Sequence, residues 1–142
     1  MNHELECLGC RLAHGLEPTH VVYEDEHVTC ILVIDPCSEG HSIILPKKHY
    51  ADVDDLDLET AQSVMKASAN LSKGLKTLFH PDGISMMQNG GKFSDLGHFH
   101  MHIWARYEND GFSWIDPLDA GARERFTETR EILASAIANL GK

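Results

Sequence analysis

The sequence predicts an α+β fold, with a mostly antiparallel sheet of about five strands, one long helix and a C-terminal helix. Three observations predict it. Short β-rich runs are separated by turn residues, one long middle stretch has helical periodicity, and a second helical pattern lies near the C-terminus. Strands, a long helix, further strands and a final helix, in that order, are typical of α+β domains.

The first strands are expected at residues 21–24 and 28–34, on either side of Asp25, Glu26 and His27. Two β-rich runs joined by a short polar segment indicate a hairpin.

A turn follows, because Pro36 and Gly40 interrupt the apolar pattern. Residues 41–45 form the next predicted strand, and Pro46, which has no amide proton for the sheet, is expected to stop it.

The long helix is predicted to begin at one of three capping carboxylates, Asp52, Asp54 or Asp55, and to end at residues 80–83 (HPDG). Its apolar residues recur every three or four positions, which favours one buried face. These residues are Val64, Ala67, Leu71, Leu75 and Leu78.

The second half of the chain completes the pattern. Residues 84–88 are a predicted strand, 89–91 a loop and 98–107 a further strand, with a turn around residues 109–111. A C-terminal helix is marked by Phe126, Leu133, Ile137 and Leu140. With 142 residues, we expect one domain spanning 1–142, with a core at about 5–107 and a helical extension at about 117–142.

The charge and composition exclude several classes of function. A formal net charge of −10 argues against general binding of nucleic acid or of an anionic membrane. An anionic ligand would need local cations, for which Lys47, Lys48, Arg106 and the histidines are the candidates. No apolar run approaches membrane-spanning length, the N-terminus does not resemble a signal peptide, and four cysteines are expected to stay reduced in the cytoplasm.

Three histidines, His98, His100 and His102, stand at alternate positions. In a strand they share one face, while the intervening apolar side chains share the other. His98 and His102 would lie about 13 Å apart along the strand, whereas ligand nitrogens lie only about 2.0–2.1 Å from zinc. One ion therefore cannot comfortably hold all three rings, although an adjacent pair could share a metal. At least one histidine must have another role.

Residues 98–104 (HFHMHIW) resemble the His-φ-His-φ-His-φ-φ signature of the histidine triad superfamily of nucleotide hydrolases and transferases. Residues 40–49 (GHSIILPKKH) resemble a second landmark of this family, and residues 33–36 (VIDP) resemble its nucleoside-binding segment. Residues 23–28 (YEDEHV) are similar to the opening hairpin of its bacterial members.

The resemblance implies that His100 is the nucleophile, which attacks the α-phosphorus of a nucleotide and forms a nucleotidyl–histidine intermediate. The backbone carbonyl of His98 is then expected to accept the proton of the other ring nitrogen. His102 is expected to contact the phosphate or the leaving group, and His41 to be the fourth histidine that supports the site. The alternative for His41 is a solvated residue at a strand end.

The resemblance also suggests substrate contacts outside the triad. Asp35 resembles the acid that accepts hydrogen bonds from both ribose hydroxyls, although aspartate before proline is also common in turns. Asn89, followed by Gly90 and Gly91, is expected to bring backbone amides to phosphate or else to form an ordinary loop.

One segment departs from the family pattern. Many members carry Gly-Gln-Ser or Gly-Gln-Thr shortly before the triad, whereas here residues 93–97 read FSDLG. Ser94 could still bind a phosphate oxygen, but Asp95 adds a negative charge where an anion should lie. The preferred leaving group is left open by this difference.

Cys7 and Cys10 form a Cys-x-x-Cys pair, which redox centres and zinc sites share. No βαβ pattern surrounds the pair, which argues against a thioredoxin-like site. Bacterial triad proteins with such a pair resemble this chain, and that resemblance implies a zinc ion held by Cys7, Cys10, His49 and His98. A closed Cys₂His₂ set is structural. Cys30 is expected in the core.

These expectations combine into a cytoplasmic hydrolase or nucleotidyl transferase with structural zinc, and the family resemblance implies a homodimer. Its small-molecule substrate would be a nucleoside phosphoramidate, a dinucleoside polyphosphate or a similar conjugate. Two alternatives stay open at this point. One is a non-catalytic nucleotide-binding regulator, and the other is a histidine-based enzyme with iron or another redox metal.

Overall fold

The computed structural model describes residues 6–141, which form two compact units divided after Gly111. Unit 1 runs to Gly111 and unit 2 begins at Phe112. The boundary lies close to residue 107, where the sequence predicts the end of the core. We describe each unit by itself.

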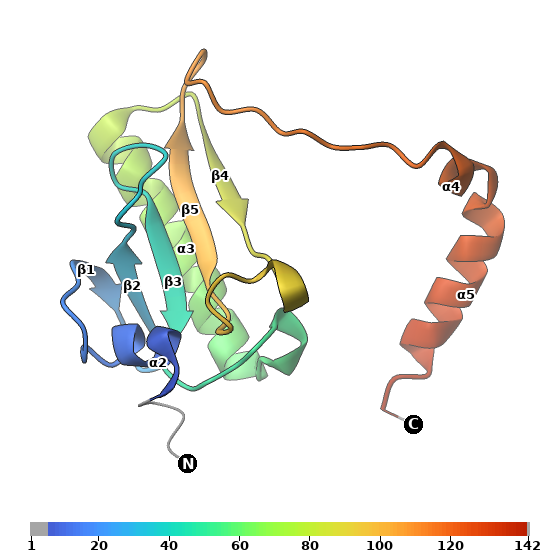
Figure 1. The fold of residues 1–142 in the computed structure, drawn as a ribbon, viewed down its shortest axis with the longest axis horizontal. Helices are drawn as coiled ribbons and strands as arrows, with labels where there is room; N and C mark the ends of the chain where they lie inside the picture. The colour runs from blue at the N-terminus through green and yellow to red at the C-terminus, as the bar shows by residue number, and fades with distance from the viewer. Residues whose placement is uncertain (1–5, 142) are drawn as a thin grey trace. The chain divides into compact units, whose positions relative to one another are not determined.

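Unit 1 contains a five-stranded sheet in the order β1-β2-β3-β5-β4, and every neighbouring pair is antiparallel (Figure 1). This sheet and its helices confirm the α+β prediction. The strands are β1 (Val21–Glu24), β2 (Val28–Leu32), β3 (Ser42–Pro46), β4 (Gly83–Met87) and β5 (Met101–Arg106).

Four of the five strands have boundaries that differ from the prediction by one to three residues, and two of these differences concern the candidate site. Pro46 closes β3 from within the strand, opposite Val28 of β2. β5 begins at Met101 rather than at residue 98, because the amide of Phe99 donates to the Tyr50 carbonyl (2.7 Å) instead of joining the sheet. His98 and His100 therefore lie just before the strand.

The long helix α3 (Leu58–Phe79) is capped by Asp57, whose carboxylate accepts a hydrogen bond from the Thr60 amide at 2.7 Å. The three predicted caps were wrong. Asp52 and Asp55 instead form a capping box around the short 3₁₀ helix η1 (Val53–Asp55). The backbone amide of Thr60 is the main cause of the lowered pKa of Asp57.

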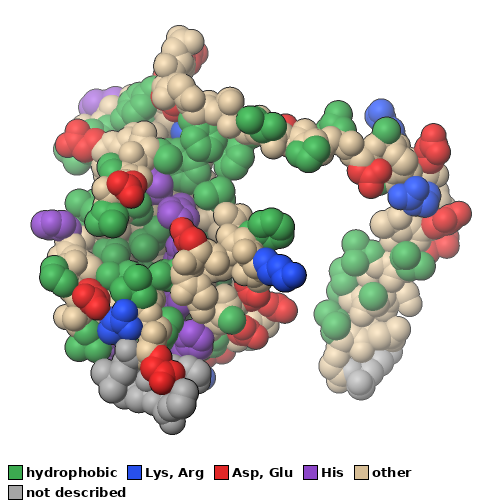
Figure 2. Space-filling model, viewed as in Figure 1, with side chains coloured by type: hydrophobic (Ala, Val, Ile, Leu, Met, Phe, Trp, Pro, Cys, Tyr) green, Lys and Arg blue, Asp and Glu red, His purple; other side chains and the backbone are tan. Residues whose placement is uncertain are grey.

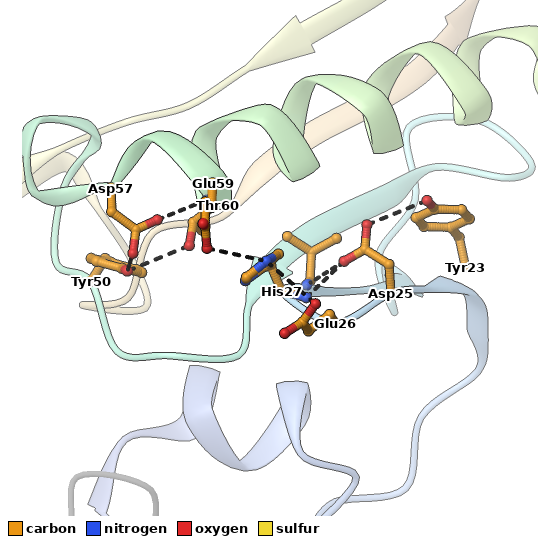
Figure 3. A network of polar contacts seen from close by, with 9 residues as sticks. Tyr23, Asp25, Glu26, His27, Tyr50, Asp57, Glu59 and Thr60 are labelled. Carbon is orange, nitrogen blue, oxygen red and sulfur yellow. Dashed lines mark hydrogen bonds and ion pairs between the residues drawn. The ribbon is translucent and has the colours of Figure 1, made fainter.

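A polar network holds the start of α3 against the neighbouring segments (Figure 3). The Tyr50 hydroxyl donates to Asp57 at 3.0 Å, and His27 lies 3.9 Å from Glu59 on the first turn of α3. Asp25 accepts from the amide of His27 at 2.8 Å and so closes the β1–β2 turn. These contacts tie the hairpin and the segment after β3 to one end of the helix.

The two faces of the sheet pack differently. α3 covers one face, where the buried cluster includes Cys30, as predicted. Of the periodic helix residues, Leu78 is 70% exposed, whereas Val64 and Ala67 are buried. The helix α2 (Leu8–Ala13), which the sequence analysis did not predict, covers part of the opposite face.

Unit 2 contains α4 (Ala120–Glu124) and α5 (Phe126–Ala138). The predicted C-terminal helix is confirmed, although its marker residues, such as Leu133 and Ile137, are exposed. Among the described residues, no helix is long and apolar enough to cross a membrane.

Candidate active site and metal centre

A pocket of about 590 Å³ lies on the sheet face opposite α3. Its apolar walls come from α2, from β2 with the residues after it, and from Ile43 of β3. Four of its lining residues are Glu17, Asp95, His100 and His102. Figure 2 shows histidine side chains gathered in a column on this unit. The structure therefore brings the second and third triad histidines to one cavity.

His100 is almost fully buried, at 5% exposed. Its Nδ1 lies 2.8 Å from the backbone carbonyl oxygen of His98, and a carbonyl can only accept. Nδ1 therefore carries a proton, and Nε2 is the ring nitrogen left for chemistry. Asp95 Oδ1 lies 3.0 Å from that Nε2. In this state the carboxyl group of Asp95 occupies the approach to the nitrogen.

His41 and His102 form a chain of hydrogen bonds with one possible proton arrangement for neutral rings. The backbone N–H of Cys37 donates to Nδ1 of His41 at 3.0 Å, so the His41 proton is on Nε2. That Nε2 lies 2.9 Å from Nδ1 of His102 and must donate to it. The proton of His102 is then on Nε2, where it can be donated to a ligand.

Burial keeps this pair neutral. It lowers the pKa of His41 to about 4, with the adjacent His102 ring as the second cause. Burial is also the largest cause of the lowered pKa of His102, which Asp95 partly opposes. His41 is only 4% exposed, so it is a member of the buried site and not a solvated residue at a strand end.

The lowered pKa of His41 predicts acid-sensitive folding. Between pH 6.5 and about 4 the unfolded state binds a proton at His41 that the folded state does not, so stability is complete above this window and falls as pH decreases through it. At about 1.4 kcal/mol per pKa unit, the loss reaches at most about 3 kcal/mol. Urea unfolding of wild type and His41→Asn across this window checks it. The variant should show a smaller loss, and parallel curves would contradict the prediction.

The predicted substrate residues lie outside the pocket lining. The exposed Asp35 is absent from it, whereas the preceding Val33 and Ile34 take part. Asn89 is also exposed, and the Ser94 hydroxyl oxygen accepts from the Gly97 amide at 3.2 Å. These three side chains are not among the residues that line the pocket, and their substrate roles remain predictions.

The expected local cations are also elsewhere. Lys47 pairs with Glu24 at 2.7 Å, and Arg106 pairs with Asp110 at 2.7 Å. Lys48 lies over the Tyr50 ring. Within the described part of the chain, no lysine or arginine lines the pocket. The expectation that these cations attract an anion to the site stays a prediction.

Sequence reasoning missed residues 17–20, which form one edge of the pocket. No motif marks this segment. Residues 17–20 reach the site because they follow α2. This helix packs against the sheet through Leu12 and Ala13.

Cys7, Cys10, His49 and His98 come together at the other end of the triad segment, with their four ligand atoms within 4.8 Å of one another. Cys7 Sγ lies 3.4 Å from His98 Nδ1, and Cys10 Sγ lies 3.5 Å from the Nδ1 atoms of His49 and His98. A tetrahedral zinc ion with its usual bond lengths separates sulfur and nitrogen ligands by about 3.5 Å. The residues therefore fit a metal ion of this kind.

The surroundings of His98 support the same interpretation. Its Nε2 lies 2.9 Å from the Pro46 carbonyl oxygen, so Nε2 donates and Nδ1 presents a lone pair to the cluster. Burial is the main cause of the lowered pKa of His98, about 4, which also favours the neutral ring that a metal requires.

Gly9 lets α2 approach this cluster. A Cβ atom at Gly9 would lie 2.4 Å from the Cβ of His98, whereas a Cβ at Gly74 of α3 would meet nothing within 4 Å. Gly9→Ala is expected to destabilise the protein by about 1–3 kcal/mol through overpacking and to weaken metal binding. Gly74→Ala is the matched control and should stabilise by roughly 0.5–1 kcal/mol. Thermal melts and metal titration check the pair, and equal behaviour of the two variants would refute the role of Gly9.

Comparisons of sequence and of structure with known proteins lead to the same family. The family model of the HIT domain matches residues 15–109. An uncharacterized HIT-like protein of Methanocaldococcus jannaschii is 37% identical over 107 residues, which cover 74% of this chain and 82% of that protein. The crystal structure of a HIT family member from Bacillus subtilis aligns with a TM-score of 0.81 and 30% identity, over 96% of this chain and 97% of the other.

Three further matches have informative names. A relative named adenylylsulfatase, from Arabidopsis thaliana, is 32% identical over 74% of this chain and 54% of its own length. A relative named adenosine 5′-monophosphoramidase, from Saccharomyces cerevisiae, is 29% identical over 68% of this chain and 60% of its own length. A zinc-bound histidine triad protein from Mycobacterium smegmatis aligns with a TM-score of 0.72 and 28% identity, over 94% and 99% of the two chains.

Proposed function

The chain belongs to the HIT domain family, and on this premise we propose that it is a nucleotide hydrolase or nucleotidyl transferase acting at the α-phosphate. One observation carries the proposal. His100 holds its Nδ1 proton against the His98 carbonyl, 2.8 Å away, and its Nε2 is directed to a pocket of about 590 Å³. This arrangement prepares a buried imidazole to act as a nucleophile.

The proposed reaction has two steps. In the first, the Nε2 lone pair of His100 attacks the α-phosphorus, and the bond from phosphorus to the leaving group breaks with its electron pair on the leaving atom. The neutral ring of His102 donates a hydrogen bond from Nε2 to that atom, which takes its proton from a water molecule. In the second step, the hydroxide left by that water attacks phosphorus, and the electron pair of the N–P bond returns to Nε2 of His100. The products are a nucleoside monophosphate and the protonated leaving group.

Other residues support binding in this proposal. The apolar wall from β2 and Ile43 offers a surface for the base, and Asp35 remains our candidate for the ribose hydroxyls. Cys7, Cys10, His49 and His98 would hold structural zinc, which stabilises the fold and takes no part in the two steps. We also propose that the protein is a homodimer, which sedimentation can test.

A substrate panel with a trapping experiment tests the function. Adenosine and guanosine phosphoramidates and dinucleoside polyphosphates are supplied, release of monophosphate is measured, and acid-free quenching with mass spectrometry locates the intermediate. We expect turnover of at least one class and nucleotide attached to His100. Nucleotide binding without turnover would indicate the regulator instead, and loss of turnover on removing iron from a folded protein would indicate the redox enzyme.

A further inference from the structure

We propose that Asp95 determines specificity by placing a carboxylate beside the attacking nitrogen of His100, so that substrates with anionic leaving groups are disfavoured. The inference rests on the proposed function and concerns the same site. It assigns a role to Asp95, which lies where many family members carry Gly-Gln-Ser or Gly-Gln-Thr before the triad.

The position of Asp95 carries the argument. Its Oδ1 lies 3.0 Å from Nε2 of His100, on the side from which phosphorus must approach. The Asp95 side chain is 85% exposed, whereas the His100 side chain is 6% exposed. The carboxylate can therefore swing aside when a substrate enters, but its charge remains next to the reacting atoms.

The backbone around Asp95 is held in place. At one end, the Gly91 amide donates to the Asp52 carboxylate at 3.1 Å. At the other end, the Gly97 amide donates to the Ser94 hydroxyl at 3.2 Å, and Ser94 itself donates from its amide to the Gly91 carbonyl. The loop thus presents Asp95 to the triad through fixed contacts on both sides.

The charges of the pocket reinforce the effect. Its lining contains the carboxylates Glu17 and Asp95, and among the described residues it contains no lysine or arginine. Glu17 pairs with Arg11 at 2.9 Å, which leaves Asp95 as the carboxylate nearest the nucleophile. Even at the dielectric constant of water, two like charges about 5 Å apart repel enough for roughly a fourfold effect. A dianionic leaving group is therefore expected to be disfavoured about tenfold or more, whereas a neutral amine is not.

The test compares two adenosine substrates that differ in the leaving group. Adenosine 5′-monophosphoramidate releases a neutral amine, and adenosine 5′-phosphosulfate releases sulfate. Asp95→Asn keeps the shape of the side chain and removes its charge. Because the α-phosphate is charged in both substrates, both kcat/KM values are expected to rise, and the value for the phosphosulfate should rise by a larger factor than the value for the phosphoramidate.

Glu108→Gln is the matched control, because it removes an exposed carboxylate that does not line the pocket. It should leave the ratio of the two kcat/KM values unchanged. Equal changes for both substrates in Asp95→Asn, or no change in either, would overturn the inference while leaving the proposed function intact.

A binding measurement tests the role of Asp95 independently of the proposed function, because it does not require turnover. Calorimetry of Asp95→Asn should show ADP bound about tenfold more tightly than by wild type, with adenosine affinity unchanged. If wild type turns over none of the substrates, the proposed function fails, but the ADP comparison still decides on Asp95. Unchanged ADP affinity in the variant would overturn its role.

Discussion

His100→Asn is expected to lower kcat by about 10³-fold or more, because the variant has no nitrogen that can attack phosphorus and be released again. This loss corresponds to about 4 kcal/mol of transition-state stabilisation. The Asn amide can still donate to the His98 carbonyl, as Nδ1 of His100 does at 2.8 Å. The fold and the affinity for a nucleoside monophosphate should therefore change little. Single-turnover kinetics and calorimetry of monophosphate binding provide the two measurements.

His80→Asn is the matched control for this variant. His80 ends α3 in a left-handed conformation, with φ of 49°, which asparagine tolerates well. The control should keep full activity. Activity of His100→Asn within a few-fold of wild type would remove His100 from the role of nucleophile.

Removal of the metal is expected to have the largest effect on stability. Zinc at about 1,000 times its dissociation constant stabilises the folded state by about 4 kcal/mol, which is on the order of 10 °C in Tm for a chain of this size. Cys7→Ser with Cys10→Ser should abolish binding and lower Tm by a similar amount. Some turnover should remain at low temperature, because the nucleophile is a different histidine. Metal analysis, melting curves and assays at low temperature provide the readouts.

Cys37→Ser is the appropriate control, since Cys37 is exposed and lies outside the metal cluster. It should retain the metal and the melting temperature. Failure of the reduced protein to bind zinc, or complete loss of turnover in a folded zinc-free protein, would contradict a structural role for the metal.

The strands, and the alternation of side chains along the triad segment, could be predicted because they depend on residues that are close together in the sequence. Alternation places Phe99 and Met101 with the core under α3, while His100 and His102 line the opposite pocket. The structure agrees with this although the strand itself starts only at Met101. The approximate ends of α3 were also predictable from periodicity and from the residues that stop the helix.

The helix cap and the pocket edge could not be predicted, because they depend on tertiary contacts. Four aspartates precede α3, and Asp57 is the cap since it also accepts the Tyr50 hydroxyl. The charge pattern indicated Lys47 as a candidate for binding phosphate, but in the structure Lys47 pairs with Glu24 of β1. A single sequence does not show which carboxylate each cation will meet after folding.

His98 contributes to two sites at once, its ring to the cysteine cluster and its carbonyl to His100. If bound zinc shifts that carbonyl, the two sites are thermodynamically linked through His98. Any factor by which bound zinc raises nucleotide affinity, through the position of that carbonyl, must equal the factor by which bound nucleotide raises zinc affinity. An occupied active site would then retain its metal at chelator concentrations that strip the empty one.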